Sequence, residues 1–417
     1  MTRRRVVITG MGAITPCGLN INDFWTSMKE GKSGISTIEN MDTAGHVVTI
    51  AGEIKNDKFN PEDYLEPKVA RRTDRYIQFA VAAAEEAIKD AGLDTAEIDK
   101  TRVGVIVGSG AGGLRTVENN ARAMFEKGPT KASPFTIPMM ITDIAAGFIS
   151  MRYGYKGVNK AVVSACATGT HAIGDAFRTI QYNDADVIVT GGCESTICLI
   201  GIGGFTAARA LSKRNNEPQK ASRPYDKDRD GFVMGEGAGI MILEEYEHAK
   251  KRGAKIYAEI IGYGQSADAY DIVAPDPEGN GIVLSMNNAL KDAQIKPEEV
   301  DYINTHATST CLGDIAESLA VAKVFGDRKQ NPNLLVSSTK SMHGHMIAAT
   351  GAVEAIVSVK AINENIVPPT INLENQDERV ADLDYVPNVA RQKEVKISMS
   401  NSFGFGGHNT TLIFKEV

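Results

Sequence analysis

The feature that most constrains the fold is a pattern that occurs twice, once in each half of the chain. Residues 161–177 (AVVSACATGTHAIGDAF) and 334–356 (LLVSSTKSMHGHMIAATGAVEAI) both read as an apolar strand, a polar turn and a helix rich in small residues. This repetition indicates a duplicated α/β unit whose two turns meet at a shared site. We expect two halves, residues 1–255 and 256–417, because 417 residues exceed the size at which one core stops growing.

The remaining apolar segments also fit an α/β fold. The run at 103–107 is continuously apolar, which is typical of a central strand covered on both faces. Further strands are predicted at 5–9, 161–163, 185–190, 257–263, 301–304, 334–338, 396–399 and 410–414. Helices are predicted at 77–91, 281–293, 314–325 and 346–362.

Composition narrows the class of protein. The net charge of −7 argues against a nucleic-acid-binding protein that works by bulk positive charge. Five cysteines without a framework spacing indicate reduced thiols in a cytoplasmic compartment. The three arginines at 3–5 precede only a short apolar run, so we expect no secretory signal. We also expect no membrane span, because no run of about 18 apolar residues exists.

Cys166 stands on the turn of the first repeated unit. The first turn of the following helix would point free N–H groups and its positive dipole end at the sulfur. Sites of this kind stabilise a thiolate, with pKa values of about 3.5–7.5. The alternative is a buried, unreactive cysteine in a helix that packs through small residues. This stretch alone does not decide between the two.

Two histidines and a lysine follow strands of the second half. His306 comes directly after the strand predicted at 301–304, and Lys340 and His345 follow the strand at 334–338. Catalytic groups in α/β sheets gather at the carboxyl ends of strands, and a cysteine with histidines placed this way is a pattern of covalent catalysis. A lone histidine is more often held by a local hydrogen bond, and this structural alternative applies to each of them.

Five motifs in order resemble the β-ketoacyl-[acyl-carrier-protein] synthases, in particular the elongating type II of bacterial fatty-acid synthesis. They are VVSACATGTHAIGDA, RDGFVMGEGAG, NTHATSTCLGD, VSSTKSMHGH and NSFGFGG, and the resemblance covers nearly the whole chain. It implies a thiolase-like fold with five αβαβα layers, a homodimer, and decarboxylative Claisen condensation of acyl-carrier with malonyl-carrier. It implies no organic cofactor and no catalytic metal.

The resemblance also implies roles for individual residues. Cys166 matches the nucleophile that takes the acyl chain, and His306 and His345 match the pair that binds the malonyl thioester oxygen. Such donors stabilise developing charge by about 2.7–4 kcal/mol each. Lys340 matches the lysine that orients this network, and Glu317 matches its acidic companion.

Further matches concern the surroundings of this set. The backbone N–H groups of Cys166 and Phe405 match the oxyanion hole, and Phe405 also matches a gate. Thr308 and Thr310 match the threonines that hydrogen-bond the phosphopantetheine arm. Basic residues that match a docking patch for the acidic carrier are Lys68, Arg71, Arg72, Lys131 and Arg209. Positions at which some family members hold a monovalent cation are Asn304, Glu354, Ser400 and Asn401.

The chain departs from the family at several positions. Ala307 and Cys311 replace a usual glycine and proline, and Asp271 and Val273 replace a histidine and a threonine of an active-site loop. These changes leave the catalytic set intact and bear on loop dynamics.

Two departures concern the acyl pocket. Ala111 and Thr136 are smaller than the residues usual there, which predicts tolerance for long or branched acyl chains. Alternatively, Leu114, Ile197 or Leu199 refill the space.

Two other functions share these motifs. A specialised elongating ketosynthase of a polyketide or secondary lipid pathway would carry all of them. A non-catalytic chain-length partner is disfavoured because such partners typically lose the cysteine that this chain retains as Cys166.

Overall fold

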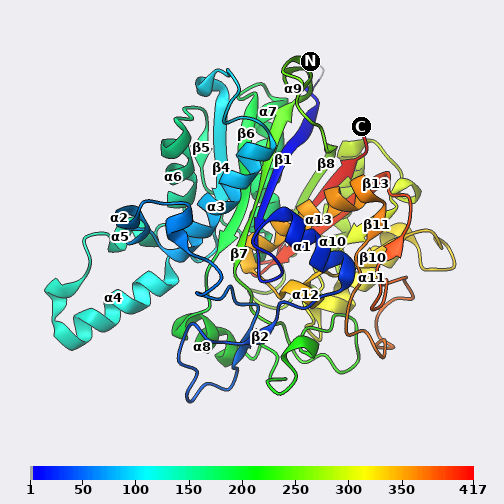
Figure 1. Cartoon of the computed structure of the whole chain (residues 1–417). Helices are drawn as coiled ribbons and strands as arrows, with labels where there is room; N and C mark the ends of the chain where they lie inside the picture. Colours follow the sequence, from blue (N-terminus) through cyan, green and yellow to red (C-terminus); the bar gives the residue numbers. More distant parts are fainter. Residues whose placement is uncertain (1–2) are drawn as a thin grey trace.

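The computed structural model describes residues 3–417 and is built around one sheet of ten strands (Figure 1). The strands of the first half are β1 (Val6–Ile14), β4 (Val103–Gly108), β5 (Asn159–Lys160), β6 (Val187–Glu194) and β7 (Gly237–Glu245). Those of the second half are β8 (Ala258–Ala267), β9 (Tyr302–Asn304), β10 (Leu335–Ser337), β13 (Ile397–Gly404) and β14 (His408–Lys415).

The strand order shows the internal duplication. It runs β10-β9-β13-β14-β8-β1-β7-β6-β4-β5, so each strand of one half has a counterpart at the same distance from the centre. In both halves the three outer strands are parallel and the inner ones antiparallel. The halves join through β1 and β8, which pair over only three residues, Val6–Ile8. The expected boundary at 255/256 lies in the connection that leads into β8.

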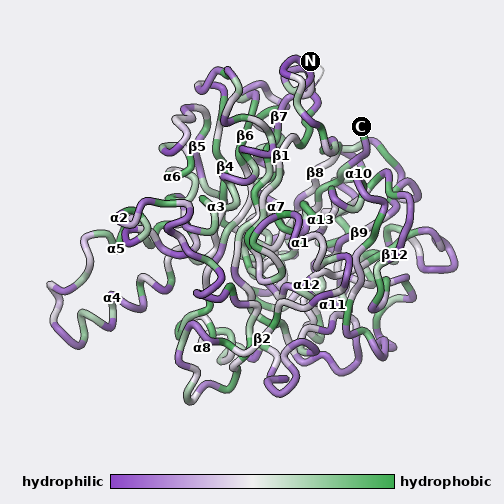
Figure 2. The backbone as a smooth tube through the Cα atoms, in the orientation of Figure 1, coloured by the Kyte–Doolittle hydropathy of each residue, from purple (hydrophilic) through white to green (hydrophobic). Residues whose placement is uncertain are grey.

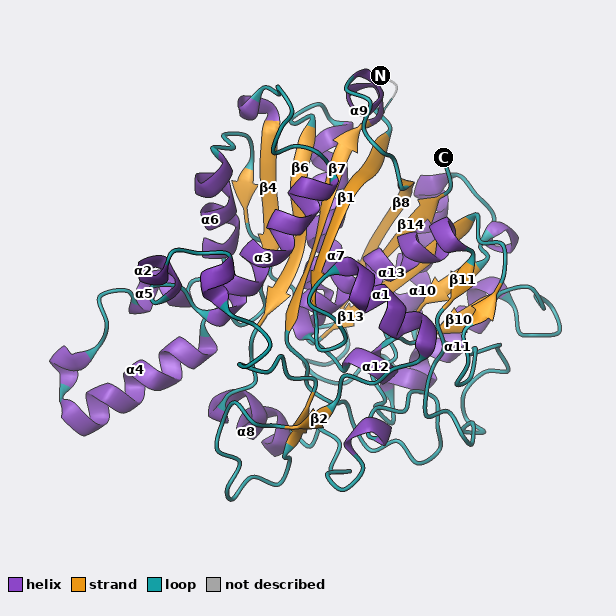
Figure 3. Ribbon diagram, in the orientation of Figure 1, coloured by secondary structure: helices purple, strands orange, loops and turns teal. Residues whose placement is uncertain are grey.

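The helices form three layers, one on the outer face of each half of the sheet and one between the halves (Figures 1 and 3). The outer layer of the first half contains α3 (Arg75–Asp90) and α6 (Ile144–Tyr153), and that of the second half contains α10 (Asn280–Ala293) and α11 (Gly313–Phe325). Between the halves lie α7 (Thr168–Gln181) and α13 (Thr350–Glu364). Three separate hydrophobic clusters correspond to these three helical layers. The expected thiolase-like αβαβα arrangement is therefore confirmed.

The central strands are buried on both faces, and their residues alternate between layers. In β6, Val187 and Val189 belong to the outer cluster of the first half, whereas Ile188 belongs to the central cluster. In β4, Val105 and Ile106 divide in the same way. This alternation follows from the period of two along a strand and explains the continuous apolar runs of the sequence. Hydrophobic residues accordingly follow the interior strands, and the peripheral loops are mostly hydrophilic (Figure 2).

The shorter elements surround this framework. They are α1 (Ile21–Glu30), β2 (Ser36–Thr37), β3 (Ile50–Ala51), α2 (Pro67–Ala70), α4 (Leu114–Lys127), α5 (Thr136–Met140), α8 (Leu199–Ala207), α9 (Tyr246–Lys251), α12 (Lys340–His343), β11 (Ile366–Val367) and β12 (Arg391–Gln392). Of these, α4 projects from the body of the protein (Figure 1). None of the helices within residues 3–417 combines the length and apolar character needed to cross a bilayer.

One predicted strand is wrong. The apolar run 161–163 lies outside the sheet, because the edge strand β5 ends at Lys160, and Val163 is 55% exposed. An edge strand has a neighbouring strand on one side only. Apolar residues in its sequence therefore do not by themselves continue the backbone hydrogen bonds of the sheet. The helix predicted from residue 346 also begins later, at Thr350, after a short 3₁₀ turn, η7 (Ile347–Ala349).

Candidate active site

Cys166 lies on a tight turn at the start of a central helix. The 3₁₀ turn η4 (Ala165–Ala167) leads directly into α7, and Ala165 has a left-handed φ of 50°. The residue facing this turn is Gly404, where a Cβ atom would lie 3.1 Å from the Cys166 nitrogen. Cys166 is 8% exposed and its side chain reaches a cavity of about 330 Å³. A small-residue turn thus presents the thiol without room for a bulkier neighbour.

The structure brings Cys166 together with the two predicted histidines. One ring nitrogen of His306, one of His345 and the Cys166 sulfur lie within 4.8 Å of one another. The two imidazole rings are nearly perpendicular, with centroids 5.3 Å apart. His306 follows β9, and His345 follows α12, so the second half supplies both rings to the nucleophile of the first. A cysteine sulfur and two imidazole nitrogens are also ligand types that bind Zn²⁺.

The Cys166 thiol is not the stabilised thiolate that the sequence suggested. Burial raises its pKa to about 12, although the Lys340 charge and the backbone N–H groups of Phe405 and Cys166 act to lower it. The sequence argument considered only the helix terminus, and the loss of water around a fully buried thiol outweighs that effect. The resting thiol is therefore protonated, and acylation requires an acceptor for its proton.

Both histidines are neutral, so each ring has one N–H donor and one acceptor nitrogen. Desolvation lowers the pKa of His306 and of His345 well below 6.5, and the Lys340 ammonium lowers both further. The Nδ1 atom of His345 lies 3.1 Å from the Thr350 hydroxyl oxygen. Its Nε2 atom is buried without a hydrogen-bond partner within residues 3–417. This nitrogen is free to interact with a ligand.

Two buried carboxylates support the histidines in different ways. Glu317 accepts hydrogen bonds from the backbone N–H groups of His306 at 2.9 Å and Ala307 at 2.7 Å, and so holds the loop rather than a ring. Glu354 accepts from the Lys340 ammonium at 2.6 Å. Burial raises the pKa of each carboxyl to about 7. The Lys340 ammonium also donates to the Thr305 carbonyl at 3.3 Å. Because its hydrogen bonds go to Thr305 and Glu354, Lys340 acts on the imidazoles through its charge.

Three of the four residues predicted to hold a monovalent cation have an unpartnered oxygen. Among the described residues, Oδ1 of Asn304, Oε2 of Glu354 and Oγ of Ser400 are buried without a hydrogen-bond partner. Hard cations bind such oxygen donors. Asn401 differs, because its side-chain oxygen already accepts from Thr411 at 2.9 Å. The donor set fits a small cation through Asn304, Glu354 and Ser400.

The other predicted site residues fall into three groups. Phe405, Thr308, Thr310 and Arg209 line the cavity together with the catalytic set. The basic residues Lys68, Arg71 and Arg72 are exposed at α2 and directly after it, and Lys131 is exposed in the 3₁₀ turn η3 (Pro129–Lys131) that follows α4. Ala111 and Thr136 do not line the cavity of the chain, and Ala111 is exposed.

Sequence reasoning missed an aromatic wall beside the histidines. Phe232 packs edge-on against His345 with centroids 5.3 Å apart, and Phe205 packs edge-on against Phe232 at the same separation. Phe205 also contacts the ring of Phe405 at 6.2 Å. The only signal in the sequence was the position of Phe232 inside the glycine-rich motif RDGFVMGEGAG. These rings exclude water from the imidazoles and contribute to their depressed pKa values.

A thiol and two neutral imidazoles, joined at the interface of two equivalent α/β halves, define a condensing enzyme of the thiolase-like class. Two family models match the chain: "Beta-ketoacyl synthase, N-terminal domain" over residues 3–249 and "Beta-ketoacyl synthase, C-terminal domain" over residues 257–374. The chain belongs to the β-ketoacyl synthase family.

Relatives that match over their full length indicate one type of enzyme within this family. The chain is 52% identical to 3-oxoacyl-[acyl-carrier-protein] synthase 2 of Coxiella burnetii and 49% identical to that of Vibrio cholerae, with all of each chain covered. Among solved structures, a β-ketoacyl synthase from Burkholderia phymatum matches with a TM-score of 0.90, 35% identity and coverage of 99% of this chain and 100% of that one. A type II polyketide ketosynthase in complex with its acyl-carrier protein matches with a TM-score of 0.91, 35% identity and full coverage of both chains.

Proposed function

We propose that the protein elongates acyl chains by condensing acyl-[acyl carrier protein] with malonyl-[acyl carrier protein], giving 3-oxoacyl-[acyl carrier protein] and CO₂ in type II fatty-acid synthesis. The observation that carries this proposal is the meeting of the Cys166 sulfur with nitrogens of His306 and His345 within 4.8 Å. Relatives of about half-identical sequence that are named 3-oxoacyl-[acyl-carrier-protein] synthase 2 support it.

The first step is transfer of the acyl chain to Cys166. The Cys166 sulfur attacks the thioester carbonyl of the acyl-carrier, and the proton of the thiol passes to the departing carrier sulfur. The backbone N–H groups of Cys166 and Phe405, which already stabilise negative charge at the sulfur, would hold the oxyanion. The carrier thiol leaves with a proton, and the acyl group remains as a thioester on Cys166.

The second step is decarboxylation and carbon–carbon bond formation. If the Thr350 hydroxyl donates to Nδ1 of His345, the proton of this neutral ring is on Nε2, the unpartnered nitrogen. His345 and His306 can then donate to the malonyl thioester oxygen while the carboxylate leaves as CO₂. The resulting enolate carbon attacks the acyl carbon on Cys166, and the sulfur leaves as a thiolate that takes one proton from solvent.

The test combines mass spectrometry with product analysis. Incubation with acyl-carrier should add the acyl mass to the peptide that contains Cys166, and later addition of malonyl-carrier should remove it and release one CO₂ per 3-oxoacyl product. A chain that never forms the adduct would instead be a non-catalytic partner. The rate across acyl-carriers of different length would separate a fatty-acid enzyme from a specialised ketosynthase, since polyketide ketosynthases are also structurally similar.

The carrier partner is proposed from local charge. The chain has a net charge of −7, but Lys68, Arg71 and Arg72 are exposed together at α2, and the Arg72 guanidinium lies 4.5 Å from the ring of Phe135. A local basic patch steers an acidic partner without net positive charge. Arg209, which lines the cavity, and Lys131, which is exposed at the turn after α4, would extend the patch.

Charge reversal tests the carrier patch. Changing Arg71 and Arg72 to Glu should raise the KM for carrier substrates and leave activity on small thioesters unchanged. Changing Lys250 and Lys251 of α9 to Glu is the control, because this helix lies apart from α2, at the top of the view in Figure 1. An unchanged carrier KM would remove the patch from the proposal.

A homodimer is proposed from apolar exposure. Phe125 on the projecting α4 is 92% exposed, Met151 on α6 is 74% exposed, and Val163 beyond the edge strand β5 is 55% exposed. Exposed apolar side chains at an open sheet edge favour association. Light scattering should give twice the chain mass, and Phe125→Asp should shift the protein toward monomer.

The remaining proposals concern environment and ions. All five cysteines are free, which suits a reducing cytoplasm. The proposed chemistry needs no organic cofactor. The unpartnered oxygens of Asn304, Glu354 and Ser400 would hold a structural monovalent cation. Replacing K⁺ and Na⁺ by choline should then lower the melting temperature, and Ser400→Ala should abolish that difference.

A further inference from the structure

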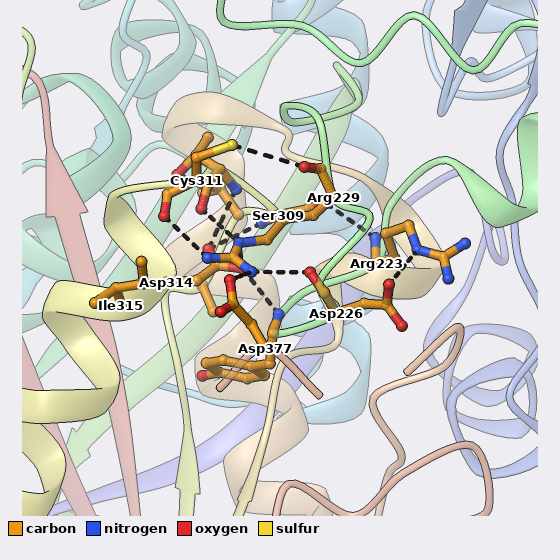
Figure 4. A network of polar contacts seen from close by, with 12 residues as sticks. Arg223, Asp226, Arg229, Ser309, Cys311, Asp314, Ile315 and Asp377 are labelled. Atoms are coloured by element: carbon orange, nitrogen blue, oxygen red, sulfur yellow. Dashed lines mark hydrogen bonds and ion pairs between the residues drawn. The ribbon is translucent and has the colours of Figure 1, made fainter. Parts of the chain in front are cut away.

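Arg229 links the two halves of the protein beside the cavity. It lies in the segment between α8 and β7 (Figure 4), and its side chain is 1% exposed. Its guanidinium donates to the carbonyl of Thr310 at 3.0 Å and to the carbonyl of Cys311 at 2.9 Å. It also donates to the Asp226 carbonyl at 2.8 Å and to the Asp377 carboxylate at 2.7 Å. Two adjacent peptide groups of the second half are thus fixed by one side chain of the first.

The loop that Arg229 holds is locally strained. Ser309 has a left-handed φ of 71°, which is unfavourable for a residue with a side chain. The Asp314 carboxylate accepts from the N–H groups of Ser309 at 3.1 Å and Thr310 at 3.3 Å (Figure 4). The Gly231 N–H donates to the Ser309 carbonyl at 3.1 Å. This conformation therefore persists because its surroundings fix nearly every peptide group.

The strained loop carries two hydroxyls into the cavity. Thr308 and Thr310 both line it, and their hydroxyl oxygens lie 3.1 Å apart. The two side chains flank Ser309, so the backbone conformation at Ser309 sets their separation. Any change in the peptide groups of 309–311 would move one hydroxyl relative to the other.

We propose that Arg229 is a positioning residue that holds Thr308 and Thr310 in register for the amide groups of the carrier's phosphopantetheine arm. The inference rests on the proposed function, because that function supplies the arm. Arg229 does not line the cavity, so it acts only through the loop. Arginine suits this task because its rigid fork reaches two carbonyls and a carboxylate at once, whereas a lysine ammonium is a single point of charge.

Arg229→Lys tests the proposal through two acyl donors. One is acyl-carrier, which presents the pantetheine amides, and the other is an acyl S-ethyl thioester, which has none. The variant should raise the KM for acyl-carrier about tenfold, the loss expected for roughly one well-placed hydrogen bond. It should acylate Cys166 with the ethyl thioester at the rate of the unaltered enzyme. An equal loss with both donors would show a general structural defect and overturn the proposal.

Arg379→Lys is the matched control. Arg379 donates to the same Asp377 carboxylate at 2.6 Å, but its side chain is 62% exposed and it has no hydrogen bond to the carbonyls of 310 or 311. This variant should leave the carrier KM unchanged. A tenfold rise in the carrier KM of Arg379→Lys would show that the effect comes from the ion pair with Asp377 and not from the loop.

A second experiment keeps the proposal falsifiable if Arg229→Lys does not fold. Asp377→Asn retains an acceptor but weakens its hold on the guanidinium, so it should raise the carrier KM by a smaller factor with an unchanged melting profile. In a Thr308→Ala, Thr310→Ala background, neither Arg229→Lys nor Asp377→Asn should raise this KM further. Additive effects would refute action through the threonines. If Cys166 is acylated but no condensation follows, the proposed function fails while the donor ratio for Arg229 can still be measured.

Discussion

The two equivalent turns of the duplicated fold have nearly the same backbone and different tasks. Ala165 before Cys166 has a φ of 50°, and Ile347 before Ala348 has a φ of 47°. Each of these residues begins a three-residue 3₁₀ turn, which is followed by a helix that begins at a threonine, Thr168 in one half and Thr350 in the other. The position of the nucleophile in the first half is therefore occupied by alanine in the second.

The surroundings of the two turns also differ. The turn of Cys166 opens into the cavity, and the N–H groups near its sulfur are available to a ligand. In the other turn, the Ala348 N–H faces the buried carboxylate of Glu194. That carboxylate also accepts from the Gly110 N–H at 2.9 Å and the Ser109 hydroxyl at 3.1 Å. One copy of the turn thus opens into a cavity, and the other faces a side chain of the protein.

The largest expected effect comes from removing the feature that distinguishes the two turns. Cys166→Ala makes them alike and should abolish condensation, because no acyl-enzyme can form. Malonyl decarboxylation should persist, since the histidines carry it. His345→Ala should give the reverse pattern, with acylated Cys166 and no decarboxylation. Release of CO₂ and the mass of the Cys166 peptide measure the two steps separately. Decarboxylation by His345→Ala at the unaltered rate would contradict the assignment.

The second prediction concerns the protonation state of Cys166. With a thiol pKa of about 12, the rate of Cys166 alkylation by iodoacetamide should rise about tenfold per pH unit from about pH 6 to pH 9. A helix terminus strong enough to form the thiolate would give a flat rate over that range. The measurement uses mass spectrometry on a Cys311→Ser variant, because Cys311 is exposed and would also react.

The comparison shows what the sequence can reveal. The repeated pattern predicts the duplicated fold although its first apolar run, 161–163, is not a strand. The positions of His306 and His345 after strands, and of Cys166 at the start of a helix, predict that they meet. These features depend on local periodicity and on where strands end, which neighbouring residues determine.

Other features depend on contacts between distant parts of the chain. The raised pKa of Cys166 follows from burial by both halves, and Arg229 reaches Asp377 across 148 residues. The failure of 161–163 to form a strand depends on its place at the sheet edge. Local patterns carry no information on solvent exclusion or on which distant group accepts a hydrogen bond, so these features become visible only in the folded structure.

The third prediction tests the carboxylate that fills the second turn. Burial raises the pKa of Glu194 from 4.5 to about 7, so the folded state binds its proton more tightly than the unfolded state does. This contribution to stability is full below about pH 4.5 and is lost as the pH rises through 7. Glu194→Gln removes the dependence, so its stability relative to the unaltered protein should increase by a few kcal/mol between pH 5 and pH 8.

Denaturant unfolding at the two pH values measures this difference. Glu317→Gln is the informative counterpart, because Glu317 holds backbone N–H groups of the catalytic loop and its pKa is also raised to about 7. Both variants should show the change in stability, but only Glu317→Gln should slow condensation. Parallel stability curves for Glu194→Gln and the unaltered protein would show that the carboxylate is already ionised at low pH.

The smallest effect is expected at Ala111, in the loop that Glu194 holds. Its N–H donates to Glu194 at 3.3 Å, and the following Gly112 packs so closely on the Met140 carbonyl that a Cβ atom would lie 2.2 Å from it. The loop is therefore fixed between Glu194 and α5, yet Ala111 itself is exposed and does not line the cavity of one chain. A partner subunit that covers this loop would turn Ala111 into a wall of the acyl pocket.

Ala111→Phe decides whether this loop measures the acyl chain. If a covered pocket extends here, each methylene excluded by the ring costs about 0.8 kcal/mol, roughly a fourfold loss in rate for long chains, and the shortest substrates keep their rate. Ile197 is fully buried in the cluster around Cys166. If it already closes the pocket, the phenylalanine ring lies in solvent and the rate is unchanged at every chain length. Ala44→Phe, at an exposed position outside the cavity lining, controls for surface aromatic character. An equal loss of rate at every chain length would instead mean that the phenylalanine ring disturbs the hydrogen bonds between this loop and Glu194. The turn of Ala348 would then stabilise the turn of Cys166 without contacting the substrate.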